Sequence, residues 1–180
     1  MARHVVLLRG VNLASRNRVR MSQLRSLLEG AGFEEVVTYL QSGNALVSSP
    51  LRPPAVARTC REAIRDALGL DLQVLVRSGR ELAAVVGRNP LGGVATNPKR
   101  YQVTFLERAP TASVVERIHA AAVESERVVL AGKEVYAWHP DSIARSRLWS
   151  LLAGPTLGVA ATARNWTTVT KLLALAESGS

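Results

Sequence analysis

The chain has 180 residues, of which 47% are hydrophobic and 21% are charged, and its formal net charge is +9. This length and balance suit one globular domain or two joined halves and exclude a disordered chain. The longest charge-free run, residues 148–163, is interrupted by Gly154-Pro155 and is shorter than the roughly 20 residues that a membrane-spanning helix needs. The apolar run before Arg9 is too short for the apolar region of a signal peptide. Cys60 is the single cysteine, so no internal disulfide can form. We therefore expect a cytoplasmic protein without a membrane partner.

In chain order, the patterns of the first half predict a strand, a helix, two strands, a helix and a strand. The expected ranges are 4–8, 22–31, 36–41, 45–48, 53–68 and 72–76. In the first helix Leu24, Leu27 and Leu28 form an apolar stripe that Ser22 can cap, and Gly69 can end the second helix. The order β-α-β-β-α-β is that of the ferredoxin-like (split βαβ) plan.

The second half repeats this order through its first five elements and then adds a last helix. A short helix over 80–86 and a loop with Asn89-Pro90 and Gly92-Gly93 join the halves. The later elements are expected at 101–106, 113–123, 127–130, 135–138, 141–152 and 167–176. Asp141 or Ser142 can cap the helix that reaches residue 152. We expect an α+β protein of two ferredoxin-like half-domains arranged as a pseudo-repeat, plus a C-terminal helix. The expected boundaries are 1–78 for the first half, 79–100 for the connection and 101–180 for the second half.

The positive charge is concentrated in two stretches, residues 1–28 and residues 142–176. The first contains six arginines, the second three arginines and a lysine, and neither contains an acidic residue. Such stretches are common as solvated faces. If they meet, they form one positive surface for a phosphate, a carboxylate or nucleic acid. Both interpretations stay open at this point.

Familiar catalytic patterns are missing from the sequence. His4, His119 and His139 are scattered, with no His-x-x-x-His pair and no carboxylate cluster nearby, so we expect no metal site. Cys60 lies on the apolar side of a predicted helix, where core packing is its expected role, and Asp141 suits a helix cap better than a base. There is neither a P-loop nor a dinucleotide fingerprint, and we expect no cofactor.

The loop after the first strand is the strongest candidate for a ligand site. It begins Arg9-Gly10-Val11-Asn12, and an arginine can bind a carboxylate or phosphate with two parallel hydrogen bonds. The alternative is that Gly10 and Asn12 only make a turn and that Arg9 pairs with an acid. For nucleic acid the charge is suitable, but the strand 45–48 lacks stacking aromatics, and Tyr101 and Phe105 suit a core.

Four segments together resemble the bacterial domain-of-unknown-function family 1697. They are residues 8–12 (LRGVN), Met21 with its leucine-rich helix, residues 38–44 (TYLQSGN) and residues 162–172 (TARNWTTVTKL). The resemblance covers essentially the whole chain and implies two ferredoxin-like halves, but no activity, because the family is uncharacterised. The chain departs from the family pattern at several positions. These are Ala14-Ser15 in place of two glycines, Arg16, Arg18 and Arg147 in place of lysines, and Thr167 in place of an asparagine.

Charge and family motifs converge on seven residues that we expect to bind a ligand. They are Arg9, Asn12, Ser42, Asn44, Arg164, Asn165 and Lys171. The leading hypothesis is a protein that binds an anionic (phosphorylated or carboxylated) small ligand in a basic polar cleft between the two halves. The alternative is a nucleic-acid-binding module, and a transferase or hydrolase acting on a phosphorylated substrate ranks third because no nucleophile and base pair is visible. A purely structural role also stays open, with Asn165 only capping the last helix.

Overall fold

The computed structural model describes residues 1–13 and 16–179, and it divides the chain into two compact units. One unit comprises Met1–Ala84 and Leu172–Ser180, and the other comprises Val85–Lys171. The helices α3 (Gly79–Arg88) and α6 (Trp166–Ser178) each contain residues of both units. Each unit has its own four-stranded antiparallel sheet, so the protein is of the α+β class.

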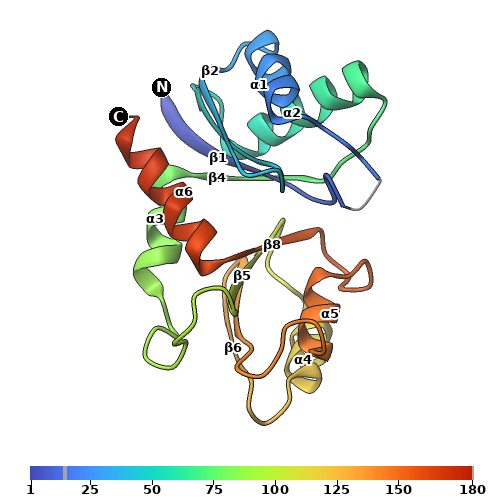
Figure 1. Cartoon of the computed structure of the whole chain (residues 1–180), viewed down its shortest axis with the longest axis vertical. Helices are drawn as coiled ribbons and strands as arrows, with labels where there is room; N and C mark the ends of the chain where they lie inside the picture. The colour runs from blue at the N-terminus through green and yellow to red at the C-terminus, as the bar shows by residue number, and fades with distance from the viewer. Residues whose placement is uncertain (14–15, 180) are drawn as a thin grey trace. The chain divides into compact units, whose positions relative to one another are not determined.

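The first unit has the strand order β2-β3-β1-β4 (Figure 1). Its elements are β1 (Ala2–Leu8), α1 (Met21–Gly30), β2 (Glu34–Tyr39), β3 (Asn44–Ser49), α2 (Pro53–Leu68) and β4 (Val74–Ser78). In the central pair of strands, Leu7 lies opposite Asn44. The end of β1 therefore lies beside the turn that joins β2 to β3.

Both helices of the first unit pack on one face of its sheet. The side chains of Leu24 and Leu28 on α1, and of Val56, Cys60 and Ile64 on α2, are completely buried in one apolar cluster with strand residues. Spacings of four residues place each set on one side of its helix. Burying a side chain of this size contributes about 1.5–3 kcal/mol, so this layer holds the helices against the sheet.

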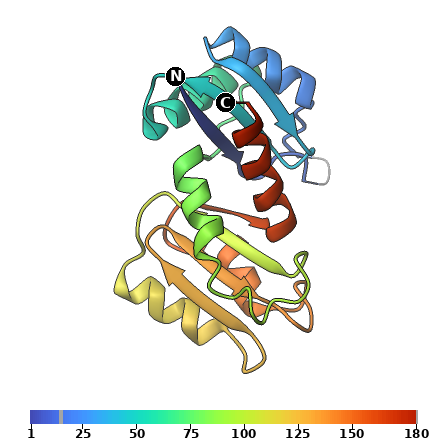
Figure 2. The same ribbon diagram turned by 90° about the vertical axis from the view of Figure 1, so that its left-hand side faces the viewer.

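The second unit has the corresponding order, β6-β7-β5-β8. Its elements are β5 (Tyr101–Leu106), α4 (Ala112–Ala121), β6 (Arg127–Ala131), β7 (Glu134–Trp138), α5 (Arg147–Ala153) and β8 (Ala161–Asn165). Val114 and Ile118 of α4 and Leu148 and Leu152 of α5 form a second apolar cluster with the strands. These two helices lie on one face of this sheet (Figure 2).

Three details of the sequence-based prediction were wrong. The strand β8 was not expected, because its small and polar residues form no apolar run, yet it pairs along its length with β5. The helix α5 begins after Ser146 rather than at residue 141 or 142, since the Ser146 hydroxyl accepts a hydrogen bond from the Trp149 N–H at 3.0 Å. The helix α1 starts at Met21, so Arg20 and not Ser22 occupies the capping position.

The end of α2 follows the prediction. Gly69 has φ +66° and closes the helix in the left-handed conformation that glycine adopts easily.

Among the helices in the described part of the chain, none is long and apolar enough to cross a lipid bilayer.

Candidate functional site

The seven predicted site residues fall into two groups. Arg9, Asn12, Ser42 and Asn44 belong to the first unit, and Arg164, Asn165 and Lys171 belong to the second. The expected meeting of the two groups stays a prediction. Residues 9–20 are called the basic loop, of which the structure describes all but Ala14 and Ser15.

The basic loop is attached to the turn between β2 and β3. The Leu8 N–H donates to the Gly43 carbonyl at 2.8 Å, and the amide Nδ2 of Asn12 donates to the Gln41 carbonyl at 2.6 Å. A second bond from the same Nδ2 reaches the Val19 carbonyl at 2.9 Å, while Oδ1 accepts the Val19 N–H at 2.8 Å. The Asn12 amide thus joins the two ends of the loop to each other and to the turn. Its predicted contact with a ligand stays a prediction.

The loop and the turn depend on residues that tolerate positive φ. Gly10, Asn12 and Asn17 have φ of +73°, +55° and +49°. Gly43 has φ +87°, and a Cβ placed there would lie 2.5 Å from Cγ2 of Val11. Glycine is required at this position both by its backbone angle and by the close approach of the basic loop.

The turn itself is held by Asn44. This residue is completely buried, and its Nδ2 donates to the Tyr39 carbonyl at 2.9 Å and to Oγ of Ser42 at 3.0 Å. Ser42 is exposed, and its neighbour Leu40 is exposed as well, with φ +59°. The polar motif of the turn therefore serves first to shape it.

The arginines supply the chemistry of the basic loop. Arg9 is partly buried and donates to Oε1 of Gln73 at 3.2 Å. Arg16, Arg18 and Arg20 are exposed, and their guanidinium groups make neither a hydrogen bond nor an ion pair with the residues that the structure describes. Val19 is buried between Arg18 and Arg20, so these two side chains project outward from the loop.

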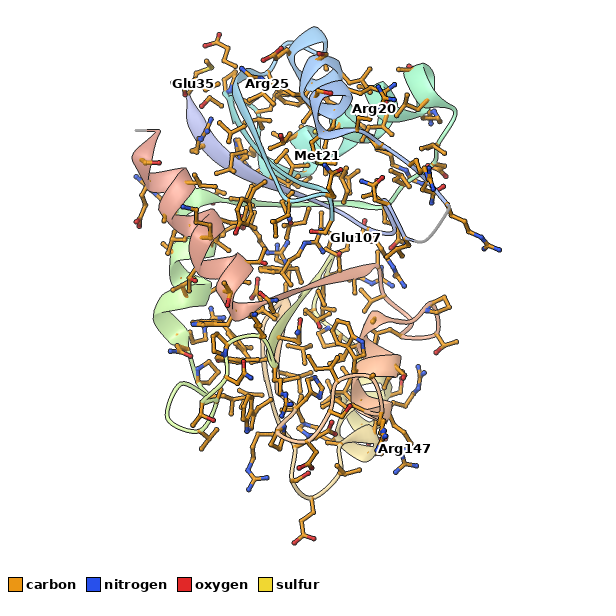
Figure 3. The ribbon with its side chains drawn as sticks, viewed as in Figure 1. Arg20, Met21, Arg25, Glu35, Glu107 and Arg147 are labelled. Atoms are coloured by element: carbon orange, nitrogen blue, oxygen red, sulfur yellow. The ribbon has the colours of Figure 1, made fainter. Side chains whose placement is uncertain are left out.

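Some other arginines of the same unit are paired, whereas the exposed Arg52, Arg58 and Arg80 also lack a side-chain partner among the described residues, so the basic loop differs in having three such arginines within residues 16–20. Arg20 and Arg25 are both labelled in Figure 3, but only Arg25 is paired, with Nε 2.9 Å from Oε1 of Glu29. Arg61 likewise forms two hydrogen bonds to Asp71, at 2.7 and 3.0 Å. The first turn of α1, which follows Arg20, contains no acidic residue, so the partial positive charge of the helix start adds to that of the arginines.

Sequence reasoning did not place Arg16, Arg18 and Arg20 among the site residues. The signal was present as the absence of acids from residues 1–28, but a count of charges cannot show which guanidinium groups stay unpaired. That information comes only from the geometry.

The second group is largely engaged in the fold. Arg164 is buried on β8 and donates to Oγ1 of Thr162 at 2.7 Å and to the Ala163 carbonyl at 2.8 Å. Burial lowers the pKa of Arg164 to about 10. Asn165 caps α6, since its Oδ1 accepts the Thr168 N–H at 2.9 Å, whereas Lys171 is exposed. The predicted ligand contacts of these three residues stay predictions.

A buried polar cluster in the second unit had no counterpart in the sequence-based prediction. One carboxylate oxygen of Glu126 contacts Nδ1 of His139 at 2.9 Å and also accepts a hydrogen bond from the Ser146 hydroxyl. The serine bonds the carboxylate and not the imidazole, so this arrangement lacks the serine–histidine contact of an activated nucleophile. Within the described residues, no three side chains of His, Cys, Asp or Glu gather as they would around a metal ion.

Comparison with known proteins gives a matching family model and a similar solved structure. The family model described as "Protein of unknown function (DUF1697)" matches residues 1–136. The solved structure of conserved bacterial protein SP0830 from Streptococcus pneumoniae is similar to this chain with a TM-score of 0.80 and 21% sequence identity, covering 97% of this chain and 98% of that one. At this identity the likeness concerns the fold alone. No curated protein is similar enough in sequence to count as a relative.

Proposed function

The chain belongs to the family of proteins of unknown function called DUF1697, and from its loop chemistry we propose that it binds an anionic small molecule, phosphorylated or carboxylated. The observation that carries the proposal is the set of exposed, unpaired guanidinium groups at Arg16, Arg18 and Arg20. Arg9 and the Ser42 hydroxyl lie on the same loop and turn and would add donors. Asn12 and Asn44 would hold this surface in shape.

The proposed affinity is modest. A hydrogen bond to a charged group contributes about 1.5–3 kcal/mol when it is well formed, and an exposed ion pair contributes about 1 kcal/mol or less. Three exposed arginines at about 1 kcal/mol each therefore supply about 3 kcal/mol, which corresponds to a Kd of roughly 6 mM. Binding in this range weakens as salt rises, because the charges are open to solvent.

Thermal-shift and calorimetric titration with nucleotides, sugar phosphates and dicarboxylates, at constant ionic strength, tests the proposal. A bound anion should raise the Tm above that in matched potassium chloride. The variant Arg16→Gln/Arg18→Gln/Arg20→Gln should lose this rise. The matched control Arg52→Gln/Arg58→Gln/Arg80→Gln removes the same charge from exposed positions elsewhere in the first unit and should keep it. If no anion stabilises the protein beyond the salt effect, the proposal fails.

A second candidate function is binding to nucleic acid. It is supported by the outward position of Arg18 and Arg20 on either side of buried Val19, which suits a phosphate backbone better than a closed pocket. Three phosphate contacts with a single strand give a slope of about −2 in log K against log salt. Gel shifts with RNA and DNA at two salt concentrations measure this slope, and absence of binding at low salt excludes this function.

We also infer that both units are ferredoxin-like and that the protein is cytoplasmic. The first inference is supported by the shared strand–helix–hairpin–helix–strand order and by the equivalent strand orders of the two sheets. The second is supported by Cys60, a single buried free thiol of the kind that suits a reducing compartment. Cell fractionation tests the location, and recovery of the protein outside the cytoplasm would refute it.

A further inference from the structure

Two leucines are exposed at adjacent loop tips of the first unit. Leu13 of the basic loop is 65% exposed, and Leu40 of the turn between β2 and β3 is 51% exposed. Single exposed apolar residues are common and need no explanation. Here, however, the neighbours of the two leucines are bonded to each other, since the Asn12 amide donates to the Gln41 carbonyl at 2.6 Å. The two apolar side chains therefore project from tips that are fixed together.

The backbone at Leu40 is unusual for its residue type. With φ +59° it adopts the left-handed conformation, which glycine or asparagine would adopt at a lower cost. An exposed leucine at such a position brings neither core burial nor a relaxed turn. Strained backbone positions of this kind cluster at functional sites.

Positive charge follows Leu13 along the same loop. Arg16 bonds through its N–H to the Leu13 carbonyl at 3.0 Å, and Arg18 and Arg20 follow along the same loop with unpaired guanidinium groups. Apolar side chains that project among free arginines fit a surface with anionic headgroups above a hydrocarbon layer. We propose that the tips formed by Leu13 and Leu40, with the arginines of the basic loop, dock on an anionic phospholipid surface. This inference rests on the proposed anion binding of the same loop and names its partner.

The leucines decide between possible partners. A soluble phosphate or a nucleic-acid backbone would use the arginines but would leave both leucines in water, and leucine offers a base no aromatic face for stacking. A second copy of the chain would bring the same uncompensated positive charge to the contact. A partner that is both anionic and apolar, as a phospholipid surface is, uses both features. Charge complementarity therefore favours the lipid surface.

This partner differs from the expectation of no membrane contact drawn from the sequence. Sequence reasoning searched for spanning segments and signal peptides, which are long apolar runs. Surface docking needs only a few exposed apolar side chains beside basic ones, and these do not form a run in the sequence. Leu13 and Leu40 lie far apart along the chain, and contacts between the loop and the turn, among them the hydrogen bond from Asn12 to Gln41, hold their segments together.

Vesicle flotation of the full chain tests the inference. The vesicles contain either phosphatidylcholine alone or phosphatidylcholine with about one third phosphatidylglycerol, a fraction chosen to give a strongly negative surface. The wild-type protein should float with the anionic vesicles only. The variant Leu13→Asn/Leu40→Asn should partition at least roughly tenfold less, because the leucines no longer enter the acyl boundary. Leu51→Asn changes another leucine of the first unit that is 41% exposed and should leave partition unchanged.

Results with the leucine and arginine variants distinguish failure of this inference from failure of the proposed function. Flotation of the double leucine variant equal to that of the wild type overturns the inference, since the arginines alone would then suffice. Wild-type protein that binds soluble anions but no vesicles overturns the inference and leaves the proposed function standing. A dimer that the leucine substitutions dissociate, without vesicle binding, assigns the tips to a second copy and also overturns it. If the triple arginine variant loses both soluble-anion and vesicle binding, the shared site is supported.

Discussion

The substitution Gly43→Ala tests whether the turn and the basic loop are packed as one piece. A Cβ at this position would lie 2.5 Å from Cγ2 of Val11 and 2.8 Å from Cβ of Leu8, both closer than real side-chain carbons come. The backbone angle φ +87° adds a cost, because an L-residue in the left-handed region is less stable by about 1–2 kcal/mol. Overpacking against a rigid strand end costs a further 1–3 kcal/mol or so. We expect a loss of about 3 kcal/mol in the free energy of unfolding.

Urea denaturation followed by circular dichroism measures this loss through the transition midpoint. Gly30→Ala is the matched control, since a Cβ there meets no atom within 4 Å and the residue ends a helix. The control should stay within about 0.5 kcal/mol of wild type. A loss of less than about 1 kcal/mol for Gly43→Ala would refute the reasoning, because neither the contact with Val11 nor the backbone angle would then have the assigned cost.

Three further predictions concern the same loop and the buried cluster. Asn12→Ala removes three hydrogen bonds, two to Val19 and one to the turn between β2 and β3. Urea denaturation should show that the free energy of unfolding falls by about 2–3 kcal/mol. An unchanged transition midpoint would show that these hydrogen bonds do not stabilise the loop. Leu40→Gly removes the strain of a leucine at φ +59° but makes the unfolded chain more flexible. The net effect should raise the free energy of unfolding by about 0.5 kcal/mol. A lower free energy of unfolding would mean that the Leu40 side chain packs on the protein. In the second unit, burial opposes ionisation of Glu126, but hydrogen bonds from Ser146, His139 and the Val123 N–H outweigh it and lower the pKa of this carboxyl. Its contribution to stability is therefore present above the ordinary glutamate pKa of about 4.3 and is lost as pH falls through the lower folded value. In denaturation curves measured over a series of pH values, Glu126→Gln should therefore reduce the fall in stability at acid pH. If the fall is unchanged, Glu126 does not cause it.

Much of the fold could be predicted from the sequence, because long apolar stripes report burial. Leu24 and Leu28 of α1 and the Val56, Cys60 and Ile64 series of α2 are buried as their spacing indicates, whereas Leu27 of the expected stripe is only partly buried. The strand β8 could not be predicted in this way. Alanine and threonine alternate there, and their burial depends on pairing with β5, a partner distant in sequence. Local periodicity contains no information about that partner.

The candidate site was only partly visible for a similar reason. The polar motifs around Asn12 and Asn44 mark a shaped loop and turn, since such residues are needed wherever the backbone takes a positive φ or leaves carbonyls unpaired. Their donors, however, point to the carbonyls of Gln41 and Tyr39. A sequence motif for shaping a loop and one for binding a ligand consist of the same residue types, so the two could not be told apart before the hydrogen bonds were known.

The distribution of hydrogen bonds separates the two roles within this loop. An amide has two N–H donors, and Asn12 directs both to backbone carbonyls, so a ligand could recruit this side chain only by breaking a bond that holds the loop. The guanidinium groups of Arg18 and Arg20 have no such commitment among the described residues, and an anion could bind them without disturbing the loop. Removing the charges and removing the hydrogen bonds of Asn12 should therefore have different effects on binding and on stability. The arginine variants should stay folded and lose binding, while Asn12→Ala should lose stability first and binding only as the loop loses its shape. If Asn12→Ala kept full stability yet lost anion binding, the amide would be a ligand contact. The structural role that we infer for Asn12 from its hydrogen bonds would then be wrong.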